Sequence, residues 1–148
     1  MKLRRAGPSN AAAVRALVRS AYAKWIPLIG REPFPMTADY DKAIVAHMID
    51  LYEEDGKLAA LIETVAADDH LLIENIAVSR DHQGKGLGDA LVAHAEMLAA
   101  KLGFGEIRLY TNQAMTENLS YYPRYGYTET HRAEQDGFHR VYFHKRLD

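Results

Sequence analysis

The chain has 148 residues, a length that fits one ordinary domain with a hydrophobic core. Its 48% of apolar and 26% of charged residues exclude a disordered chain, and it has no apolar run of the length of a membrane span. The absence of cysteine excludes disulfides, thiolate zinc sites and cysteine nucleophiles. A net charge of −2 argues against a nucleic-acid partner. The basic start lacks the apolar segment of a secretory signal, so we expect a cytoplasmic protein with no membrane partner.

The first third of the chain predicts a short strand, two helices and an irregular segment. Lys2–Arg5 is the strand, and apolar residues at helical spacing indicate an amphipathic helix over about Ala11–Lys24. Three prolines and a glycine in Trp25–Thr37 exclude a long regular element there. A second helix is predicted at Tyr40–Met48.

The remaining elements follow closely on one another. Asp55-Gly56 and Asp136-Gly137 are strong signals for hairpin turns. The apolar run His70–Ser79 predicts a buried central strand. The other strands are predicted at Ile49–Glu54, Lys57–Val65, Glu106–Thr111, Tyr127–His131 and Val141–Lys145, and the other helices at Gly86–Leu102 and Thr116–Tyr122. This order predicts one α/β (α+β) domain, residues 1–148, with a mixed, mostly antiparallel sheet of about 6–7 strands flanked by about four helices.

Three glycines, Gly84, Gly86 and Gly88, lie between the predicted central strand and the longest helix. Glycines allow successive backbone N–H groups to point into one concavity, and a helix N-terminus adds partial positive charge. Arg80, His82 and Lys85 supply side-chain charge nearby. The segment therefore predicts a site for an anion, especially a phosphate.

Two familiar phosphate loops fit this segment poorly. The P-loop needs Ser or Thr after Gly-Lys, and here Lys85 is followed by Gly86. The dinucleotide fingerprint needs a third glycine where Asp89 stands. A nucleotide-binding or phosphoryl-transfer enzyme is thus disfavoured, and a tight connection without a ligand is the remaining alternative.

Gln83-Gly-Lys-Gly-Leu-Gly88 resembles the Gln/Arg-x-x-Gly-x-Gly/Ala motif of the GCN5-related N-acetyltransferase (GNAT) family. Asn75–Ser79 is similar to the fourth-strand segment of that family, and Glu117–Tyr127 to its closing segment. Lys2–Asn10 is similar to its first strand and turn, so the resemblance extends along essentially the whole chain.

The resemblance implies that the chain binds acetyl-CoA as acyl donor. The pyrophosphate would bind the backbone amides of the glycine loop, which are those of Gln83, Gly84, Lys85, Gly86, Leu87 and Gly88, with Asp89 next in line. The pantetheine arm would pair with the fourth strand at Ile76, Ala77 and Val78. The Val78 N–H would then stabilise the oxyanion of the tetrahedral intermediate.

Tyr122 corresponds to the tyrosine that the family commonly uses to protonate the departing thiolate. A phenol with a pKa of about 10 keeps its proton at neutral pH and can donate it. Tyr121 is the main competitor, and Tyr122 could also simply pack in this tyrosine-rich segment. The asparagine that the family often has seven residues earlier is Met115 here, so Asn118 is the nearer candidate for a donor contact, with Asn112 as the alternative. Pro123 predicts that the last helix ends early.

Glu74 is the candidate general base, predicted on the same strand face as Ile76 and Val78. It could take a proton from an ammonium group directly or through water, or it could serve only as an ion pair or ammonium anchor. Many relatives use a water chain with no dedicated base. His131 and His139 are weaker options, and His94 is predicted as a core histidine. The scattered histidines predict no metal.

The resemblance places the acceptor pocket around Trp25, Phe34 and Tyr40, although these aromatics could simply cover the sheet. The expected activity is direct acetyl transfer to a primary amine of a small molecule or peptide, since no cysteine is available for an acetyl-enzyme. The alternative is a catalytically silent acyl-CoA-binding sensor or interaction module. Relatives are often dimers, so a homodimer is left open.

Overall fold

The computed structural model describes residues 1–148 and contains one seven-stranded sheet in the order β1-β2-β3-β4-β5-β7-β6. All neighbouring strands are antiparallel except β4 and β5, which are parallel. The strands are β1 (Arg4–Arg5), β2 (Met48–Glu54), β3 (Lys57–Ala66), β4 (Leu71–Val78), β5 (Glu106–Asn112), β6 (Thr128–Gln135) and β7 (Phe138–Arg146).

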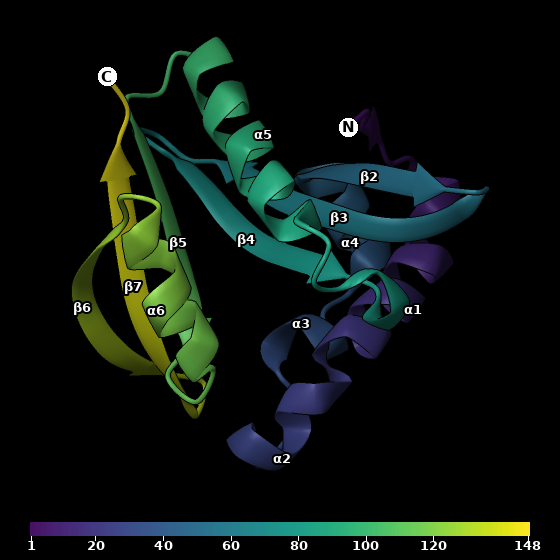
Figure 1. Cartoon of the computed structure of the whole chain (residues 1–148), viewed down its shortest axis with the longest axis horizontal. Coiled ribbons are helices and arrows are strands. Elements are labelled where there is room, and N and C mark those ends of the chain that lie inside the picture. Colours follow the sequence, from purple (N-terminus) through teal and green to yellow (C-terminus); the bar gives the residue numbers. More distant parts are fainter.

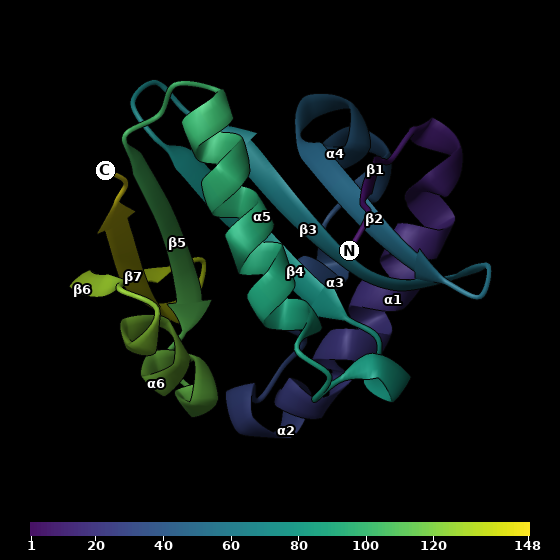
Figure 2. The same ribbon diagram turned by 45° about the horizontal axis from the view of Figure 1, so that its top comes forward.

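Helices cover both faces of this sheet. Figure 1 shows α5 and α6 in front of the strands and α1 behind them, and the turned view of Figure 2 shows α5 running along β3 and β4. None of the helices combines the length and the apolar composition that a membrane crossing requires. The helices are α1 (Ala11–Tyr22), α2 (Ile26–Ile29), α3 (Phe34–Thr37), α4 (Tyr40–Ala46), α5 (Leu87–Lys101) and α6 (Thr116–Arg124), with 3₁₀ turns at Pro8–Asn10, Ala23–Trp25 and Arg80–His82.

Two hydrophobic clusters hold these layers together. One packs α1 and α4 against β2 and β3 and includes Val14, Val18 and Ile49. The other packs α5 against β4, β5 and β7 and includes Leu91 and Ile107. Each cluster buries one sheet face, which is why the central strands are rich in aliphatic residues.

The sheet opens between its two parallel strands. The pairing of β4 with β5 covers only Leu71–Ile73 and Ile107–Leu109. Beyond these residues the two strands diverge, and Figure 1 shows the wedge that separates the N-terminal strands from the C-terminal ones. The second half of β4 is therefore a sheet edge in the middle of the molecule.

The predicted elements are confirmed, with differences at three places. Both Asp-Gly pairs form tight hairpin turns with positive φ angles, such as 53° at Asp136 and 81° at Gly137. The hairpin of β6 and β7 is longer than its apolar residues indicated, because β6 is exposed along its length. The segment Trp25–Thr37 contains the single-turn helices α2 and α3, whose prolines lie at their starts.

The early end predicted for the last helix is wrong, because α6 includes Pro123 and ends at Arg124. The proline lies in the last turn, where its missing N–H removes a single helical hydrogen bond. The chain then turns tightly through Gly126, which has a φ of 90°. Bonds from the Tyr125 and Gly126 amides to carbonyls three residues earlier complete this turn.

Candidate functional site

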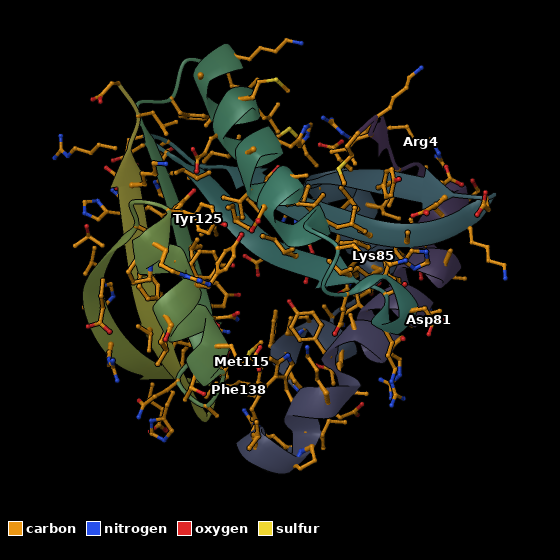
Figure 3. All side chains as sticks on the ribbon, in the orientation of Figure 1. Arg4, Asp81, Lys85, Met115, Tyr125 and Phe138 are labelled. Atoms are coloured by element: carbon orange, nitrogen blue, oxygen red, sulfur yellow. The ribbon has the colours of Figure 1, made fainter.

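A cavity of about 320 Å³ lies where β4 and β5 diverge. Its walls come from the end of α1, the segment after it, β4, the glycine loop, β5, α6 and β7. In Figure 3, Lys85 and Asp81 mark the glycine-loop side of the opening, and Met115 and Phe138 mark the opposite side. The cavity gathers most predicted site residues, namely Trp25, Phe34, Glu74, Ile76, Val78, Gln83, Gly84, Gly86, Leu87, Gly88, Asn118 and Tyr122.

The glycine loop presents unbonded backbone amides at one end of this cavity. None of the N–H groups from Gln83 to Asp89 donates to another backbone group. The loop reaches this shape through Gly84 and Gly86, whose φ angles of 79° and 81° are unfavourable for other residues. The start of α5 adds the positive end of its helix dipole. Together these features make a concave site for an anion.

The edge of β4 continues from this anion site. The Ser79 amide donates to a β3 carbonyl at 2.8 Å, and bonded and non-bonded pairs alternate along an antiparallel ladder. Ala77 therefore bonds to β3, whereas Ile76 and Val78 turn their N–H and C=O groups toward the opening. Ala77, predicted together with them, has its side chain in the core and lies outside the cavity.

Side chains from the N-terminal half fix this edge and the loop. The Tyr22 hydroxyl donates to the Ile76 carbonyl at 3.0 Å. The Gln83 side chain donates to the Val78 carbonyl and accepts from the Lys24 amine, both at 3.0 Å. Gln83 thus acts as a brace that joins the loop to β4 and to the end of α1, in addition to its place in the predicted motif.

Two residues of the predicted loop lie outside the cavity wall. Lys85 is exposed, and it contributes positive charge without lining the cavity. The Asp89 carboxylate accepts a hydrogen bond of 2.5 Å from the Tyr121 hydroxyl. This bond connects the first turn of α5 to α6 across the sheet opening.

The same bond separates the roles of the two neighbouring tyrosines. The Tyr121 hydroxyl is held by Asp89, whereas Tyr122 lines the cavity and its hydroxyl has no partner in the protein. The Tyr122 ring packs against Tyr127 and Phe143, with centroid distances of 5.7 and 5.8 Å. Burial raises the pKa of Tyr122 to about 12, so the phenol keeps its proton at neutral pH.

Asn118 lines the cavity from the first turn of α6. Its amide nitrogen donates to the Thr111 hydroxyl at 2.9 Å, which orients the side chain toward the end of β5. Met115, which stands at the position where the family often has asparagine, is buried against the same Thr111. The alternative residue, Asn112, accepts from the Ala114 amide and shapes the turn before α6.

The predicted strand face of Glu74 is wrong, because β4 contains a bulge at this residue. Glu63 pairs with Asn75 and Thr64 with Ile73, which leaves Glu74 without a partner on β3. Glu74 and Asn75 therefore both face the side of α3 and α4. Ile76 and Val78 pack instead toward α5.

The bulge directs the Glu74 carboxylate at Tyr110 of β5. The Tyr110 hydroxyl donates to Glu74 at 2.8 Å, across the point where the strands separate. Burial and the neighbouring Glu74 raise the pKa of Tyr110 well above its usual value, so Tyr110 remains a donor. This bond holds one carboxylate oxygen and leaves the second free to accept from a ligand.

Tyr40, predicted as a lining residue, lies outside the main cavity. It is buried, and its hydroxyl donates to the Pro35 carbonyl at 2.5 Å. It contributes to an adjacent cavity of about 220 Å³, where the Glu63 carboxylate lies 2.6 Å from the His47 imidazole. Burial raises the pKa of Glu63, and the bond to His47 opposes that rise.

Among the polar cavity residues that sequence reasoning missed are Tyr110 and Arg140. Both come from strands of the C-terminal half and share a face of the sheet, with Arg140 paired to Asn112 in register. Tyr110 alternates with buried residues of β5, which is the pattern of any half-exposed strand position. Arg140 lies in a hairpin rich in charged residues, and nothing in that pattern marked it as buried.

The segment Gly30–Met36 forms the remaining wall by docking on the C-terminal hairpin. The Arg31 guanidinium stacks on the Phe138 ring at 3.5 Å and donates to the Asp136 carbonyl. Gly137 lies so close that a side chain there would approach Arg31 to 3.2 Å. This docking explains the unusual composition of the segment, which brings Phe34 to the cavity.

The three histidines considered from the sequence, His94, His131 and His139, lie outside the main cavity. His94 is a satisfied core-facing residue as predicted, with its imidazole 2.9 Å from the buried Asp50 carboxylate. His131 stacks on Tyr142, and His139 is exposed, and neither lines the cavity. No group of three or more histidine, aspartate and glutamate side chains has the arrangement of a metal site.

Comparisons with known proteins point in one direction. The model of the acetyltransferase (GNAT) family matches residues 12–127. No curated protein sequence matches the chain. The structure is similar to the PaiA N-acetyltransferase of Thermoplasma acidophilum in complex with coenzyme A, with a TM-score of 0.83 and 16% identity over 99% of this chain and 98% of that chain.

Two further solved structures have the same arrangement. One is a GNAT family acetyltransferase from Elizabethkingia anophelis with acetyl-CoA bound, with a TM-score of 0.73 and 16% identity over 99% and 97% of the two chains. The other is the ribosomal-protein-S18-alanine N-acetyltransferase of Escherichia coli, with a TM-score of 0.77 and 20% identity over 99% and 93%. At these identities the likeness is one of fold.

Proposed function

The chain belongs to the GNAT acetyltransferase family, and from this premise we propose that it transfers the acetyl group of acetyl-CoA directly to a primary amine of a small molecule or peptide. The observation that carries the proposal is the run of unbonded amides from Gln83 to Asp89 beside the free edge of β4. Acetyl-CoA has a pyrophosphate, which can accept hydrogen bonds from the loop amides. The pyrophosphate is followed by an extended arm with two amides, which can pair with the edge of β4.

In this proposal the donor is bound mainly by backbone groups. The pyrophosphate oxygens accept from the loop amides at the start of α5, and the exposed Lys85 adds positive charge. The amide arm follows β4, where β5 leaves the N–H groups of Ile76 and Val78 unused, and their carbonyls already accept from Tyr22 and Gln83. Asn118 lines the cavity on the α6 side.

The proposed reaction begins with loss of a proton from the ammonium form of the acceptor. Glu74 takes this proton directly or through a water molecule, with its carboxylate oriented by Tyr110. The neutral nitrogen attacks the thioester carbon, a C–N bond forms and negative charge moves to the carbonyl oxygen. The Val78 N–H donates to this oxygen, and one such donor is worth about 3 kcal/mol in the transition state.

The reaction ends when the C–S bond breaks. Tyr122 donates its proton to the departing thiolate, and the phenol is available because its pKa of about 12 keeps it protonated. The nitrogen loses a second proton as it becomes an amide. That proton balances the one the sulfur gains, so Tyr122 is regenerated.

The test combines donor binding with turnover. We expect acetyl-CoA and CoA to raise the melting temperature, and ATP to have a much smaller effect because it lacks the amide arm. We expect thiol release from acetyl-CoA with at least one member of a panel of amines and peptides, and mass spectrometry should show an added acetyl group on nitrogen.

Each outcome discriminates between functions. Stabilisation by ATP but not by CoA would contradict the donor site and favour a nucleotide-binding protein. Intact CoA binding without thiol release across the panel would contradict the enzyme and favour an acyl-CoA-binding sensor. Acetylation of a hydroxyl rather than an amine would contradict the nitrogen specificity alone.

A further inference from the structure

Arg140 is a buried cation without a counter-charge. It lies on β7 with 8% of its surface exposed, and it lines the main cavity. None of the ion pairs or side-chain hydrogen bonds of the structure involves its guanidinium. Its nitrogens are not sealed in the core, and an unpaired charge at a largely buried position facing a cavity suits an anionic ligand.

Two aromatic rings compensate only part of that charge. The Arg140 guanidinium carbon lies 4.2 Å from the centroid of the Tyr110 ring and 5.6 Å from that of Phe34. Such contacts use the flat faces of the guanidinium and leave the N–H donors at its edge unused. A planar carboxylate can accept two of these donors side by side.

The other basic residues in and near the cavity wall have polar partners in the protein. Lys24 donates to the Gln83 side chain at 3.0 Å, and His82 lies 2.5 Å from the Ser79 hydroxyl. Arg31 lies outside the cavity wall, where it stacks on Phe138 and donates to a carbonyl. Among the basic residues of the cavity wall, Arg140 is therefore the buried one whose side chain has no hydrogen-bond or ion-pair partner in the protein.

The Glu74 carboxylate, which is opposite in charge to Arg140, lies at the hydroxyl end of Tyr110. The Tyr110 hydroxyl donates to Glu74 at 2.8 Å, while its ring contacts Arg140. Glu74 and Arg140 do not form an ion pair with each other, although both line the cavity. A molecule that carries a positive and a negative group could satisfy both.

We propose that the acceptor is an amine that also carries a carboxylate, as in an amino acid, and that Arg140 binds this carboxylate while Glu74 faces the amine. This inference rests on the proposed acetyl transfer and names its substrate class. The rings of Trp25 and Phe34 line the same cavity, which favours an acceptor with an apolar side chain.

The test compares amino acids with their own carboxamides on the unmodified protein. L-phenylalanine with L-phenylalaninamide, and L-methionine with L-methioninamide, differ only in the group that Arg140 is proposed to bind. We expect kcat/KM to be higher by about 100-fold for the acids, because loss of one partner leaves Arg140 buried and unpaired. An aminophosphonate of the same skeleton tests whether another oxyanion is preferred.

Two variants assign the preference to this residue. In Arg140→Met we expect kcat/KM for the acids to fall by about 100-fold and that for the amides to change by less than about threefold. Arg140→Lys should recover part of the acid activity, since it keeps the charge but not the paired donors. Arg132→Met on the exposed strand β6 is the matched control, and the ratio of acid to amide should not change.

The outcomes separate this inference from the proposed function. Equal kcat/KM for acids and amides in the unmodified protein would overturn the inference and leave acetyl transfer intact. An equal loss for acids and amides in Arg140→Met would also overturn it, because a purely structural role predicts that result. A preferred phosphonate would replace the carboxylate with another anion. Absence of thiol release with every amine, despite donor binding, would overturn both proposals.

Discussion

The two sides of the cavity are built from different kinds of groups. The side formed by β4 and the glycine loop offers backbone amides, such as those of Gln83 and Val78. The opposite side, formed by β5, β7, the docked segment and the bulge of β4, offers side chains, namely Glu74, Tyr110 and Arg140. We refer to them as the donor side and the acceptor side.

This difference has a physical consequence for what each side can recognise. Backbone groups are the same in every residue, so the donor side depends on backbone shape and suits one constant ligand. Charged and aromatic side chains differ from one protein to the next, so the acceptor side can be altered without disturbing the fold. We therefore expect changes on the two sides to affect separate steps.

The largest expected effect comes from Tyr122, whose hydroxyl belongs to chemistry rather than to donor binding. In Tyr122→Phe we expect kcat to fall by about 100-fold, the lower end of the range for a general acid, because sulfur then leaves without a proton donor. The dissociation constant of acetyl-CoA should remain within about threefold, since the donor side binds through its backbone. Steady-state kinetics and calorimetry measure these two quantities.

Tyr121→Phe is the discriminating variant, because its hydroxyl is held by Asp89 and lies outside the proposed chemistry. Its kcat should stay much closer to that of the unmodified protein. If Tyr121→Phe lost activity while Tyr122→Phe kept it, the two roles would have to be exchanged. If Tyr122→Phe weakened acetyl-CoA binding as strongly as it lowered kcat, donor binding would depend on this side chain and not mainly on backbone groups.

The contrast between a side built from backbone groups and a side built from side chains explains which features could be predicted from the sequence. The glycine loop is recognisable because its function depends on local conformation, and Gly84 and Gly86 have the positive φ angles that glycine spacing predicts. The hairpin turns and α5 are local in the same sense. The family resemblance added the element order, which no single pattern establishes.

The acceptor side was largely hidden for the opposite reason. Arg140 and Phe34 are 106 positions apart (140 − 34) and meet only because the segment Gly30–Met36 docks on the hairpin. The face of Glu74 depends on a bulge, which adds one residue to β4 and has no composition signal of its own. Tyr40 was predicted to line the pocket because it is aromatic, but the packing of α4 buries it below the cavity.

Replacing Gly86 would change the backbone conformation of the glycine loop. We expect its effect on donor binding to be smaller than the effect of Tyr122→Phe on turnover. Gly86 has a φ of 81°, and a Cβ there meets no atom within 4 Å, so Gly86→Ala strains only the backbone. If the loop relaxes, its amides turn away from the anion, and we expect acetyl-CoA binding to weaken by about tenfold. Calorimetric titration with acetyl-CoA measures this change.

Gly56→Ala is the matched control for that experiment. Gly56 has a φ of 77° and open space around it, but it lies in the hairpin turn of β2 and β3, away from the cavity. Both variants should lose a similar amount of stability, and only Gly86→Ala should lose donor affinity. Equal affinities in the two variants would show that the loop amides do not bind the donor.

The smallest expected effect concerns the polar groups buried below the acceptor side. Glu63 is 4% exposed, and burial raises its pKa above the ordinary value of 4.5, with the nearby Glu74 adding to the rise and His47 opposing it. In the window between 4.5 and the raised pKa, the folded state binds more protons at Glu63 than the unfolded state does. The free energy of unfolding therefore falls as pH rises through that window.

Glu63→Gln removes this titration while retaining a polar group of the same size beside His47. Relative to the variant, the unmodified protein should lose unfolding free energy as the pH rises above 4.5, because the pKa of Glu63 is raised in the folded state. Urea denaturation at several pH values measures the difference, with Glu129→Gln on exposed β6 as the control for loss of one charge. A difference that stays constant with pH would show that burial does not raise the pKa of Glu63 in the folded protein.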